Sequence, residues 1–327
     1  MKLPEELMEK FKLPYIEELE KFLEKEINGI YKVKSKRIQE TRDGKKFLLL
    51  TLEDRTGSVR AVDWYNAEKN DEWIQIGSII GVSGKVVYFD ERLQINILNA
   101  DDALRMVPEF DYDIERFVSK TKNQEEMFKE LINLIKSVKD NDYRKLLEAF
   151  FIEDKSFAEA YKSAPAGVRV HHSYIGGLLE HSLSVAKLAE YTCKIYSQLD
   201  RDLLITGAIL HDVGKVKEYS INQKGIEVTT EGELLGHIII GIEFINQRAR
   251  GIAYEKLLKL KHLIASHHGE FEWGSPVVPK TLEALVLHYI ENMDSKINRV
   301  FQIIGREDDS KEWSEFDTNL SRRFLLK

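Results

Sequence analysis

Apolar and polar residues alternate along five short stretches between residues 28 and 105, and this alternation is typical of β-strands. Turn-forming pairs and runs such as Asp43-Gly44 and Asp54–Gly57 separate several of them. Five short strands in a segment of this length indicate a small closed barrel. The expected strands are residues 30–33, 46–52, 58–64, 78–88 and 93–97.

Through most of the remaining chain, apolar residues recur every three or four positions, which is the period of α-helices. We expect a helical segment over 1–27, a helical connector over 106–160 and a nearly all-helical domain over 161–304. Residues 305–327 are highly charged, and we expect either a solvated tail or a helix that packs back near the site of the second domain. The predicted fold class is multidomain α+β: a five-stranded β-barrel over 28–105, followed by an all-α bundle.

Composition narrows the class of protein. The chain has 327 residues, of which 43% are hydrophobic and 31% charged, as in globular proteins of about two domains. The single cysteine excludes an intrachain disulfide, and the charged N-terminus lacks the apolar stretch of a signal peptide. No apolar run is long enough to span a bilayer, so a cytoplasmic protein without membrane association is expected. The net charge of −7 counts against a generally basic nucleic-acid binder, but not against a local basic groove.

Seven of the nine histidines lie between residues 171 and 268, and five of these seven are candidates for a metal site. The adjacent pair His211-Asp212 ends a predicted helix, and Gly214 follows as a terminator. His181 shares an apolar helix face with Leu178 and Val185, so its side chain points inward. A lone inward histidine is more often a hydrogen-bonded core residue than a ligand. The five candidates are His181, His211, His237, His267 and His268, and the other two of the seven are His171 and His172.

Asp294 lies on the apolar stripe of another predicted helix, together with Leu287 and Ile290. A carboxylate in such a place must be paired or bound to a metal ion. We therefore expect one ion to be held by His181, His211, Asp212 and Asp294. Imidazole and carboxylate together suit Mn²⁺, Fe²⁺, Co²⁺, Ni²⁺ or Zn²⁺ rather than Ca²⁺. Seven ligand-type side chains are too many for one ion and about right for two, and two neighbouring ions can clamp a phosphoryl group and activate water.

The order His, His-Asp, Asp resembles that of the HD-domain metal-dependent phosphohydrolases. This resemblance implies that Asp212, His237, His267 and His268 hold a second ion; the alternative is a phosphate site without one. It also implies that Lys215 contacts the phosphate or the leaving oxygen, where the alternative is an ordinary surface lysine. Arg169, His171 and His172 precede the first ligand and could contact a phosphodiester backbone, or could hydrogen-bond within their own loop.

The strand order of residues 28–105 resembles the OB-fold of anticodon-type nucleic-acid-binding modules. Such barrels bind single strands by stacking bases on aromatic rings beside basic side chains. For any one residue, core packing or plain solvation is an alternative role. The candidate groove residues are Lys46, Phe47, Arg60, Trp64, Tyr88 and Arg92.

The barrel, followed by "GGLLEH", "GAILHDVGK", "EGELLGHIIIG" and "ASHHGEFEWGSP", resembles the YhaM-like 3′–5′ exoribonuclease family over nearly the whole chain. The resemblance implies removal of nucleotides from the 3′ end of single-stranded RNA, or of single-stranded DNA, with Mn²⁺ or a similar ion, and a homo-oligomer. In this interpretation Asp212 and Lys215 act at the scissile phosphate.

Two other functions compete with this interpretation. One is an HD phosphohydrolase acting on small or cyclic nucleotides, with the barrel serving assembly only. The run His267-His268-Gly269 followed by Trp273–Pro276 loosely resembles the HD-GYP cyclic-dinucleotide phosphodiesterases, but the GYP triplet is absent. The other is a non-enzymatic nucleic-acid-binding protein, against which the intact ligand set argues.

Overall fold

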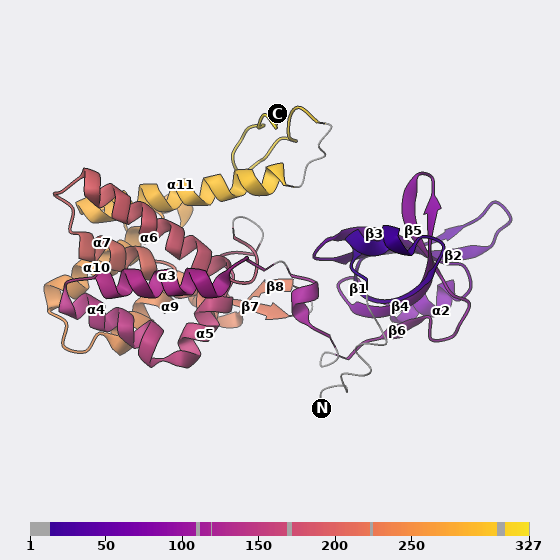
Figure 1. Cartoon of the computed structure of the whole chain (residues 1–327), viewed down its shortest axis with the longest axis horizontal. Helices are drawn as coiled ribbons and strands as arrows, with labels where there is room; N and C mark the ends of the chain where they lie inside the picture. The colour runs from indigo at the N-terminus through magenta and orange to yellow at the C-terminus, as the bar shows by residue number, and fades with distance from the viewer. Residues whose placement is uncertain are drawn as a thin grey trace. The chain divides into compact units, whose positions relative to one another are not determined.

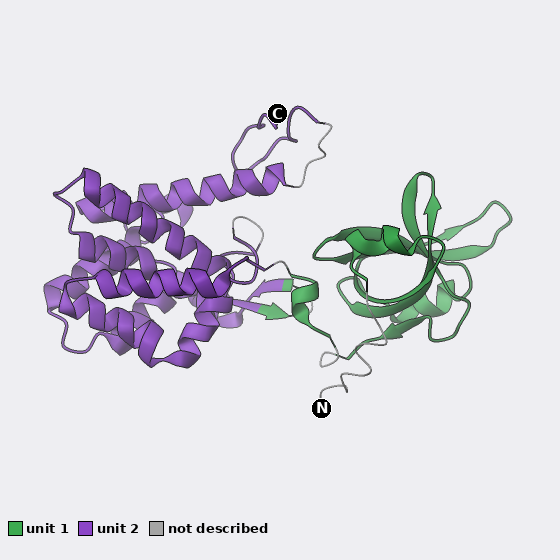
Figure 2. Cartoon of the chain, viewed as in Figure 1, with its two compact units in different colours: residues 1–119, 221–225 green, residues 120–220, 226–327 purple. Residues whose placement is uncertain are grey.

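The chain divides into two compact units (Figure 2), of which the first spans residues 1–119 with 221–225 and the second spans 120–220 with 226–327. The computed structural model describes residues 14–108, 112–118, 120–168, 172–222, 225–305 and 311–326. The first unit is built on a β-barrel and the second on a helical bundle (Figure 1).

The barrel of the first unit has five strands, as predicted. They follow the order β1-β2-β3-β5-β4, and the pairing of β1 with β4 closes the sheet. Only β3 and β5 run parallel, and a bulge between Val33 and Ser35 lets the long first strand pair with both neighbours. The strands are β1 (Glu26–Glu40), β2 (Lys46–Asp54), β3 (Gly57–Asp63), β4 (Ile79–Phe89) and β5 (Arg92–Ile97).

Side-chain alternation along β2 explains the barrel core. Leu48, Leu50 and Leu52 are fully buried inside the barrel, whereas Leu49 and Thr51 face outward. Tyr31 of β1 is also buried, and its hydroxyl donates to the carbonyl oxygen of Pro14 at 3.0 Å. The barrel is therefore filled by side chains, and any ligand must bind on its outer face.

The first unit also contains elements that the sequence pattern did not predict. A short strand β6 (Leu104–Met106) extends the sheet beside β4, and helix α2 (Ala67–Trp73) connects β3 to β4. Of the helix expected over 1–27, the described part forms a 3₁₀ helix, η1 (Ile16–Phe22), and then enters β1. Residues 1–13 lie outside the described residues. A second 3₁₀ turn, η2 (Ile114–Arg116), follows the barrel.

The second unit is the predicted helical bundle. Helices α6 (Gly177–Ile195), α7 (Arg201–Leu210) and α11 (Leu282–Ile304) run alongside one another (Figure 1). Fully buried residues such as Leu178, Leu204 and Leu287 join them. Aspartate and threonine side chains cap several helices; Asp200, for example, accepts from the backbone N–H of Leu203. The elements are α3 (Gln124–Ser137), α4 (Asn141–Glu148), the π-turn η3 (Ala149–Glu153), α5 (Lys155–Ser163), α6 (Gly177–Ile195), α7 (Arg201–Leu210), α8 (Lys215–Glu218), β7 (Tyr219–Asn222), β8 (Gly225–Val228), α9 (Thr230–Arg248), α10 (Tyr254–Ser266), η4 (Phe271–Trp273) and α11 (Leu282–Ile304).

Two parts of this unit differ from the expectation. The β7–β8 hairpin interrupts the helices, and residues 311–326 contain no helix. These C-terminal residues form turns held against α11 by an ion pair of 2.6 Å between Arg299 and Asp317. No helix in the described part of the chain is long and apolar enough to cross a membrane.

Candidate metal centre

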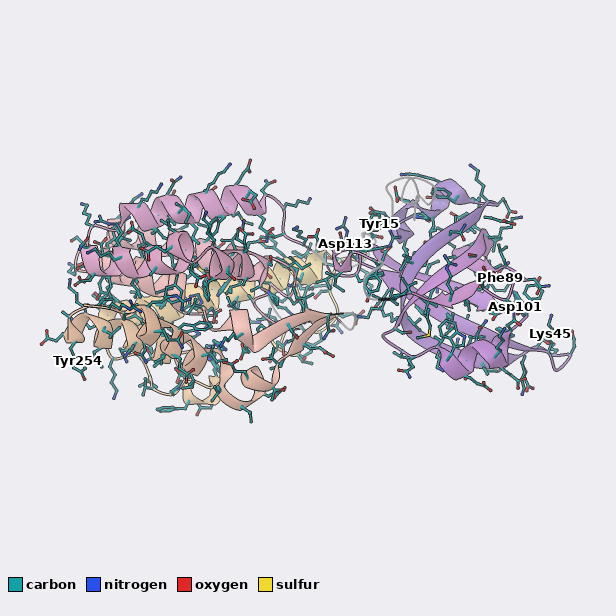
Figure 3. All side chains as sticks on the ribbon, turned by 90° about the horizontal axis from the view of Figure 1, so that it is seen from below. Tyr15, Lys45, Phe89, Asp101, Asp113 and Tyr254 are labelled. Atoms are coloured by element: carbon teal, nitrogen blue, oxygen red, sulfur yellow. The ribbon has the colours of Figure 1, made fainter. Side chains whose placement is uncertain are left out.

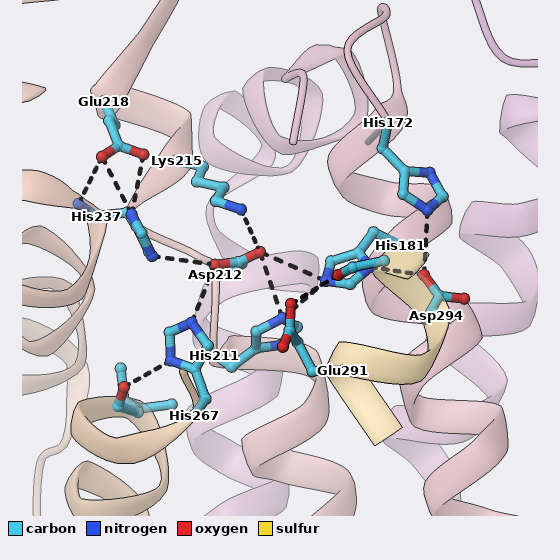
Figure 4. Close-up of polar contacts among 12 residues, drawn as sticks. His172, His181, His211, Asp212, Lys215, Glu218, His237, His267, Glu291 and Asp294 are labelled. Atoms are coloured by element: carbon cyan, nitrogen blue, oxygen red, sulfur yellow. Dashed lines mark hydrogen bonds and ion pairs between the residues drawn. The ribbon is translucent and has the colours of Figure 1, made fainter. Parts of the chain in front are cut away.

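Six helices or helix ends contribute to a buried polar centre in the second unit (Figure 4). His181 comes from α6, and His211-Asp212 follows directly after α7. His237 lies in α9, just after Gly236, whose φ of +69° kinks the helix. The remaining members are Lys215 and Glu218 of α8, His267 and His268 after α10, and Glu291 and Asp294 of α11.

Asp212 lies at the middle of this centre. Its Oδ2 is 3.3 Å from Nε2 of His211 and 3.6 Å from Nε2 of His181. Its Oδ1 is 3.4 Å from Nε2 of His237 and 3.5 Å from Nε2 of His267. One carboxylate thus presents one oxygen to each of two histidine clusters, which is the arrangement that a bridging ligand requires.

The other ring nitrogen of three histidines is engaged away from Asp212. Nδ1 of His211 donates to the carbonyl oxygen of Ala208 at 2.9 Å, and Nδ1 of His267 donates to that of Ile264 at 2.7 Å. Nδ1 of His237 donates to Oε1 of Glu218 at 3.1 Å. These contacts fix the tautomer and leave Nε2 of each ring as a lone-pair donor directed into the centre.

The centre fits divalent metal ions. Asp212 Oδ1, His237 Nε2, His267 Nε2 and His268 Nδ1 are buried, and none of them has a hydrogen-bond partner among the described residues. Buried polar atoms are normally satisfied, so these atoms need a ligand. Two groups have donor atoms within 4.8 Å of one another: His181 with His211 and Asp212, and His237 with His267 and His268.

The ionisation states suit metal binding as well. Burial lowers the pKa of His181 and of His267 to about 4, so both rings are neutral ligands at pH 7. Burial opposes ionisation of Asp212, but the charge of Lys215, whose Nζ is 2.7 Å from Oδ2, outweighs it and holds the pKa of this carboxyl well below its usual range. The centre therefore presents at least two neutral imidazoles, those of His181 and His267, beside a carboxylate.

Asp294 reaches His181 from the far side of the ring. Its Oδ2 is 2.7 Å from Nδ1 of His181 and 3.1 Å from Nε2 of His172, and these three residues form a third group of potential ligands. Burial opposes its ionisation, but hydrogen bonds from His172 and His181 lower the pKa of Asp294 well below the usual range. That Asp294 shares an ion with His211 and Asp212 stays a prediction.

The other predicted site residues have different surroundings. Lys215 is almost fully buried and pairs with Asp212, unlike a surface lysine. His172 is only 2% exposed, and its Nδ1 lies 2.9 Å from the Tyr174 hydroxyl, so its contacts are those of a residue that holds Asp294. Arg169 and His171 lie outside the described residues.

Sequence reasoning missed two carboxylates. Glu218 orients His237, and Glu291 lies close enough to His211 and Asp212 to interact with their charges, while burial raises its pKa. Helical spacing contained a signal for each of them. Glu218 is three residues after Lys215, and Glu291 is three residues before Asp294, so each shares a helix face with a candidate.

The predicted groove residues of the barrel fall into two separate hollows. Arg60, Tyr88 and Arg92 line a hollow of about 660 Å³, whose rim includes Phe89 and Arg37. Lys46 and Trp64 line another of about 490 Å³, and Lys46 pairs there with Glu68 at 2.5 Å. Phe47 is buried against Trp64, with ring centroids 4.6 Å apart.

The fold and the site define a protein in which a nucleic-acid-binding OB-fold precedes an HD domain. The family model described as "HD domain" matches residues 178–296, and that described as "OB-fold nucleic acid binding domain" matches residues 32–102. A third, described as "Putative helicase", matches residues 115–199.

Comparison with known proteins makes the identification more specific. The chain is 33% identical over 302 residues to the 3′-5′ exoribonuclease YhaM of Oceanobacillus iheyensis, covering 90% of each chain. It is 35% identical over 268 residues to the protein of the same name from Bacillus subtilis, covering 81% of this chain and 83% of that one. The chain belongs to the YhaM 3′-5′ exoribonuclease family, as the sequence motifs predicted.

Proposed function

We propose that this protein is a metal-dependent 3′–5′ exoribonuclease that hydrolyses phosphodiester bonds from the 3′ end of single-stranded RNA. One observation carries the proposal: the buried donor atoms of Asp212, His237, His267 and His268 have no hydrogen-bond partner among the described residues. Membership of the YhaM family supports the choice of substrate and of polarity. A cytoplasmic location is part of the proposal, because such a substrate is found there.

Two divalent ions are part of the proposal. His181, His211, Asp212 and Asp294 would hold one, and Asp212, His237, His267 and His268 the other. Mn²⁺ suits this mixture of imidazole and carboxylate, as do Co²⁺, Fe²⁺, Ni²⁺ and Zn²⁺. When bound, such ions supply Lewis acidity toward the phosphoryl oxygens and activate water at neutral pH.

The protein's own groups would orient the reaction. Asp212 would be shared by the two ion sites, because its two carboxylate oxygens face different histidine clusters. Lys215, fixed at 2.7 Å from Asp212, carries the cation nearest to this point, where it can stabilise charge that develops on the phosphate or the leaving oxygen. His181 and His267, whose rings are neutral at pH 7, would bind an ion without first losing a proton.

The barrel would hold the upstream part of the strand. Its larger hollow combines Arg37, Arg60 and Arg92 with Tyr88 and Phe89, and the guanidinium of Arg60 lies 5.3 Å from the centre of the Phe89 ring. Figure 3 shows Phe89 projecting from the barrel. Basic groups beside exposed rings suit a single strand, whose phosphates and bases both need partners. Lys46 and Trp64 would form a second, smaller contact, with Phe47 supporting the Trp64 ring from beneath. Single-stranded DNA is an alternative ligand.

Association of copies through α11 is a further part of the proposal. Seven apolar side chains recur along its exposed face at every third or fourth residue, which gives a straight stripe. These side chains are about half exposed and present on the order of 600 Å² of apolar accessible surface per copy. A symmetric pair of copies would bury roughly 1,200 Å² in total, which is at the lower end of the range for stable interfaces. The molar mass from light scattering tests this. The residues are Leu282, Leu285, Tyr289, Met293, Ile297, Phe301 and Ile304.

The decisive experiment incubates the protein and Mn²⁺ with a 5′-labelled single-stranded RNA. We expect a ladder that shortens from the 3′ end, is blocked by a 3′-phosphate and is lost in Asp212→Ala and His267→Ala. The matched control is His262→Ala on the same helix, because His262 lies outside the centre and accepts from the backbone of Lys280. Hydrolysis of a cyclic dinucleotide with no loss from the RNA 3′ end would overturn the proposal in favour of a small-nucleotide phosphodiesterase.

A further inference from the structure

The loop that follows the His267-His268 pair is held in one conformation. Gly269 has a φ of +82°, and a Cβ at this position would overlap the ring of His288, so only glycine fits. At the other end of the loop, the Ser275 hydroxyl lies 3.2 Å from the carbonyl oxygen of Ala265 and 2.8 Å from that of Val277. The 3₁₀ turn η4 is thus fixed between two anchored residues.

This fixed turn exposes two aromatic rings. Phe271 is 63% exposed and Trp273 is 54% exposed, although large aromatic side chains are usually covered. Nζ of Lys296 lies 5.8 Å from the centre of the Trp273 ring, and within the described residues it has no carboxylate partner. The loop therefore combines two open ring faces with an uncompensated positive charge.

The same loop adjoins the candidate metal centre. A Cβ on Gly274 would lie 4.0 Å from Nδ1 of His268, one of the buried atoms without a hydrogen-bond partner among the described residues. The ring of Trp273 lies 5.8 Å from that of His288, which donates from Nδ1 to the carbonyl oxygen of His267 at 3.0 Å. Lys296 belongs to α11, the helix that also contains His288 and Asp294. A ligand lying on the two rings would consequently be next to the metal ligands.

We propose that Phe271, Trp273 and Lys296 form a binding subsite for the nucleotides adjoining the scissile bond, with bases stacked on the rings and a backbone phosphate paired with the lysine. This subsite rests on the proposed function, which it deepens. Every base offers a π-face, so stacking would accept any sequence. The ammonium group of Lys296 is complementary to a phosphodiester, whereas a purely apolar partner would leave it unpaired.

If the subsite exists, the two rings should bind the bases of the RNA and Lys296 should bind its backbone, and an experiment can separate the two. The test compares Trp273→Ala and Phe271→Ala with the native protein on two RNAs, one complete and one abasic at its last three nucleotides. We expect either change to raise KM and weaken RNA binding by roughly 5- to 150-fold for the complete RNA, the loss that removal of one stacked base gives. On the abasic RNA the variants should match the native protein. Lys296→Ala should weaken both RNAs.

Tyr254→Ala is the matched control, because Tyr254 is 75% exposed and begins α10, whereas His267 follows the other end of this helix, about 20 Å away. Fluorescence anisotropy with labelled RNA in EDTA gives a readout that does not depend on bound metal or turnover. Equal losses on complete and abasic RNA, or unchanged KM and affinity in both ring variants, would overturn the subsite. So would a fall in molar mass, which would make the rings a contact between copies.

The two proposals fail in different ways. If the native protein does not shorten RNA but binds it, and Trp273→Ala weakens that binding only when bases are present, the exonuclease assignment is wrong and the stacking surface stands. If the native protein shortens RNA and the ring variants do so with native KM and affinity, only the subsite is wrong.

Discussion

Glu218 and His237 form a carboxylate–histidine pair that faces Asp212. Oε1 of Glu218 accepts from both the backbone N–H and Nδ1–H of His237, each at 3.1 Å. Nε2 of the same ring then lies 3.4 Å from Oδ1 of Asp212. Burial opposes ionisation of Glu218, but its bond with His237 lowers the pKa, so the carboxylate stays charged and increases the basicity of the ring.

Glu218→Gln should weaken metal binding by roughly 10- to 100-fold, which is the usual effect of losing such an outer partner. The amide keeps the size of the side chain but removes its charge. Competition with a metallochromic chelator measures the affinity. Glu231→Gln is the control, because Glu231 pairs with Lys217 away from the centre. Equal affinity of Glu218→Gln and the native protein would contradict the orienting role.

Lys215→Met should lower kcat on RNA by roughly 100-fold and leave metal content unchanged. The change keeps the length of the side chain but removes the cation that lies 2.7 Å from Asp212. Loss of one charge that stabilises a transition state has an effect of this size. Single-turnover rates and elemental analysis of the dialysed protein measure the two quantities. A variant that loses its metal and its activity together would show that Lys215 acts on Asp212 alone.

The metal-free protein should lose stability as the pH falls from 7 to 5. His181 and His267 have folded pKa values of about 4, below the ordinary 6.5, so the unfolded chain binds more protons in this window. The contribution of these two histidines to the free energy of unfolding is fully present above pH 6.5 and is lost as the pH falls toward 4. Burial also lowers the pKa of His268, which adds to the effect.

One histidine opposes this trend. Burial disfavours the charged form of His211, but the Asp212 carboxylate outweighs it and raises the pKa, so His211 favours folding at lower pH. Burial also lowers the pKa of His262 and raises that of Glu291, so four histidines act against His211 and Glu291, while Asp212 and Asp294 titrate below the window. We expect Tm in EDTA to fall by roughly 5–10 °C between pH 7 and pH 5. A Tm that is constant or rises over this range would contradict the neutral state of the buried rings.

The sequence predicted the barrel strands and the long helices because one side of each element is buried over many residues. The strand β6 has only three residues, and α2 has about two helical turns and is nearly all polar, so neither contains a clear alternation of apolar and polar positions. The β7–β8 hairpin was missed for the same reason. An element could therefore be predicted when it was long enough and buried one of its sides.

The site was predictable only in part. His211-Asp212 and the doublet His267-His268 were found because adjacent ligand-type residues end helices on apolar faces. Glu218 and Glu291 depend on how α8 and α11 pack around them, which the pattern along one helix does not contain. In the barrel, Phe47 and Trp64 alternate like exposed groove residues, but they stack on each other and cover the outer face of β2 and β3.

Gly269→Ala should destabilise the protein more than Gly251→Ala. Both glycines have a positive φ, +82° and +75°, so both substitutions add backbone strain of about 1–3 kcal/mol. Only at Gly269 would the new Cβ overlap a neighbour, the ring of His288, while Gly251 has nothing within 4 Å. We expect Tm to fall by roughly 3–6 °C in Gly251→Ala and by at least twice as much in Gly269→Ala. Equal shifts would mean that His288 moves freely and does not hold the loop.

Arg60→Ala should weaken RNA binding and reduce its dependence on salt. If Arg60 contacts one phosphate of a single strand, its removal should make the slope of log K against log salt shallower by about 0.7. Arg60→Lys keeps the charge but loses the planar group that lies 5.3 Å from the Phe89 ring, so it should keep the slope and lose affinity. Lys85→Ala is the control, since Lys85 pairs with Glu24 at 2.7 Å and lines neither of the two barrel hollows. Anisotropy at several salt concentrations measures both quantities, and an unchanged slope in Arg60→Ala would exclude a phosphate contact at this position.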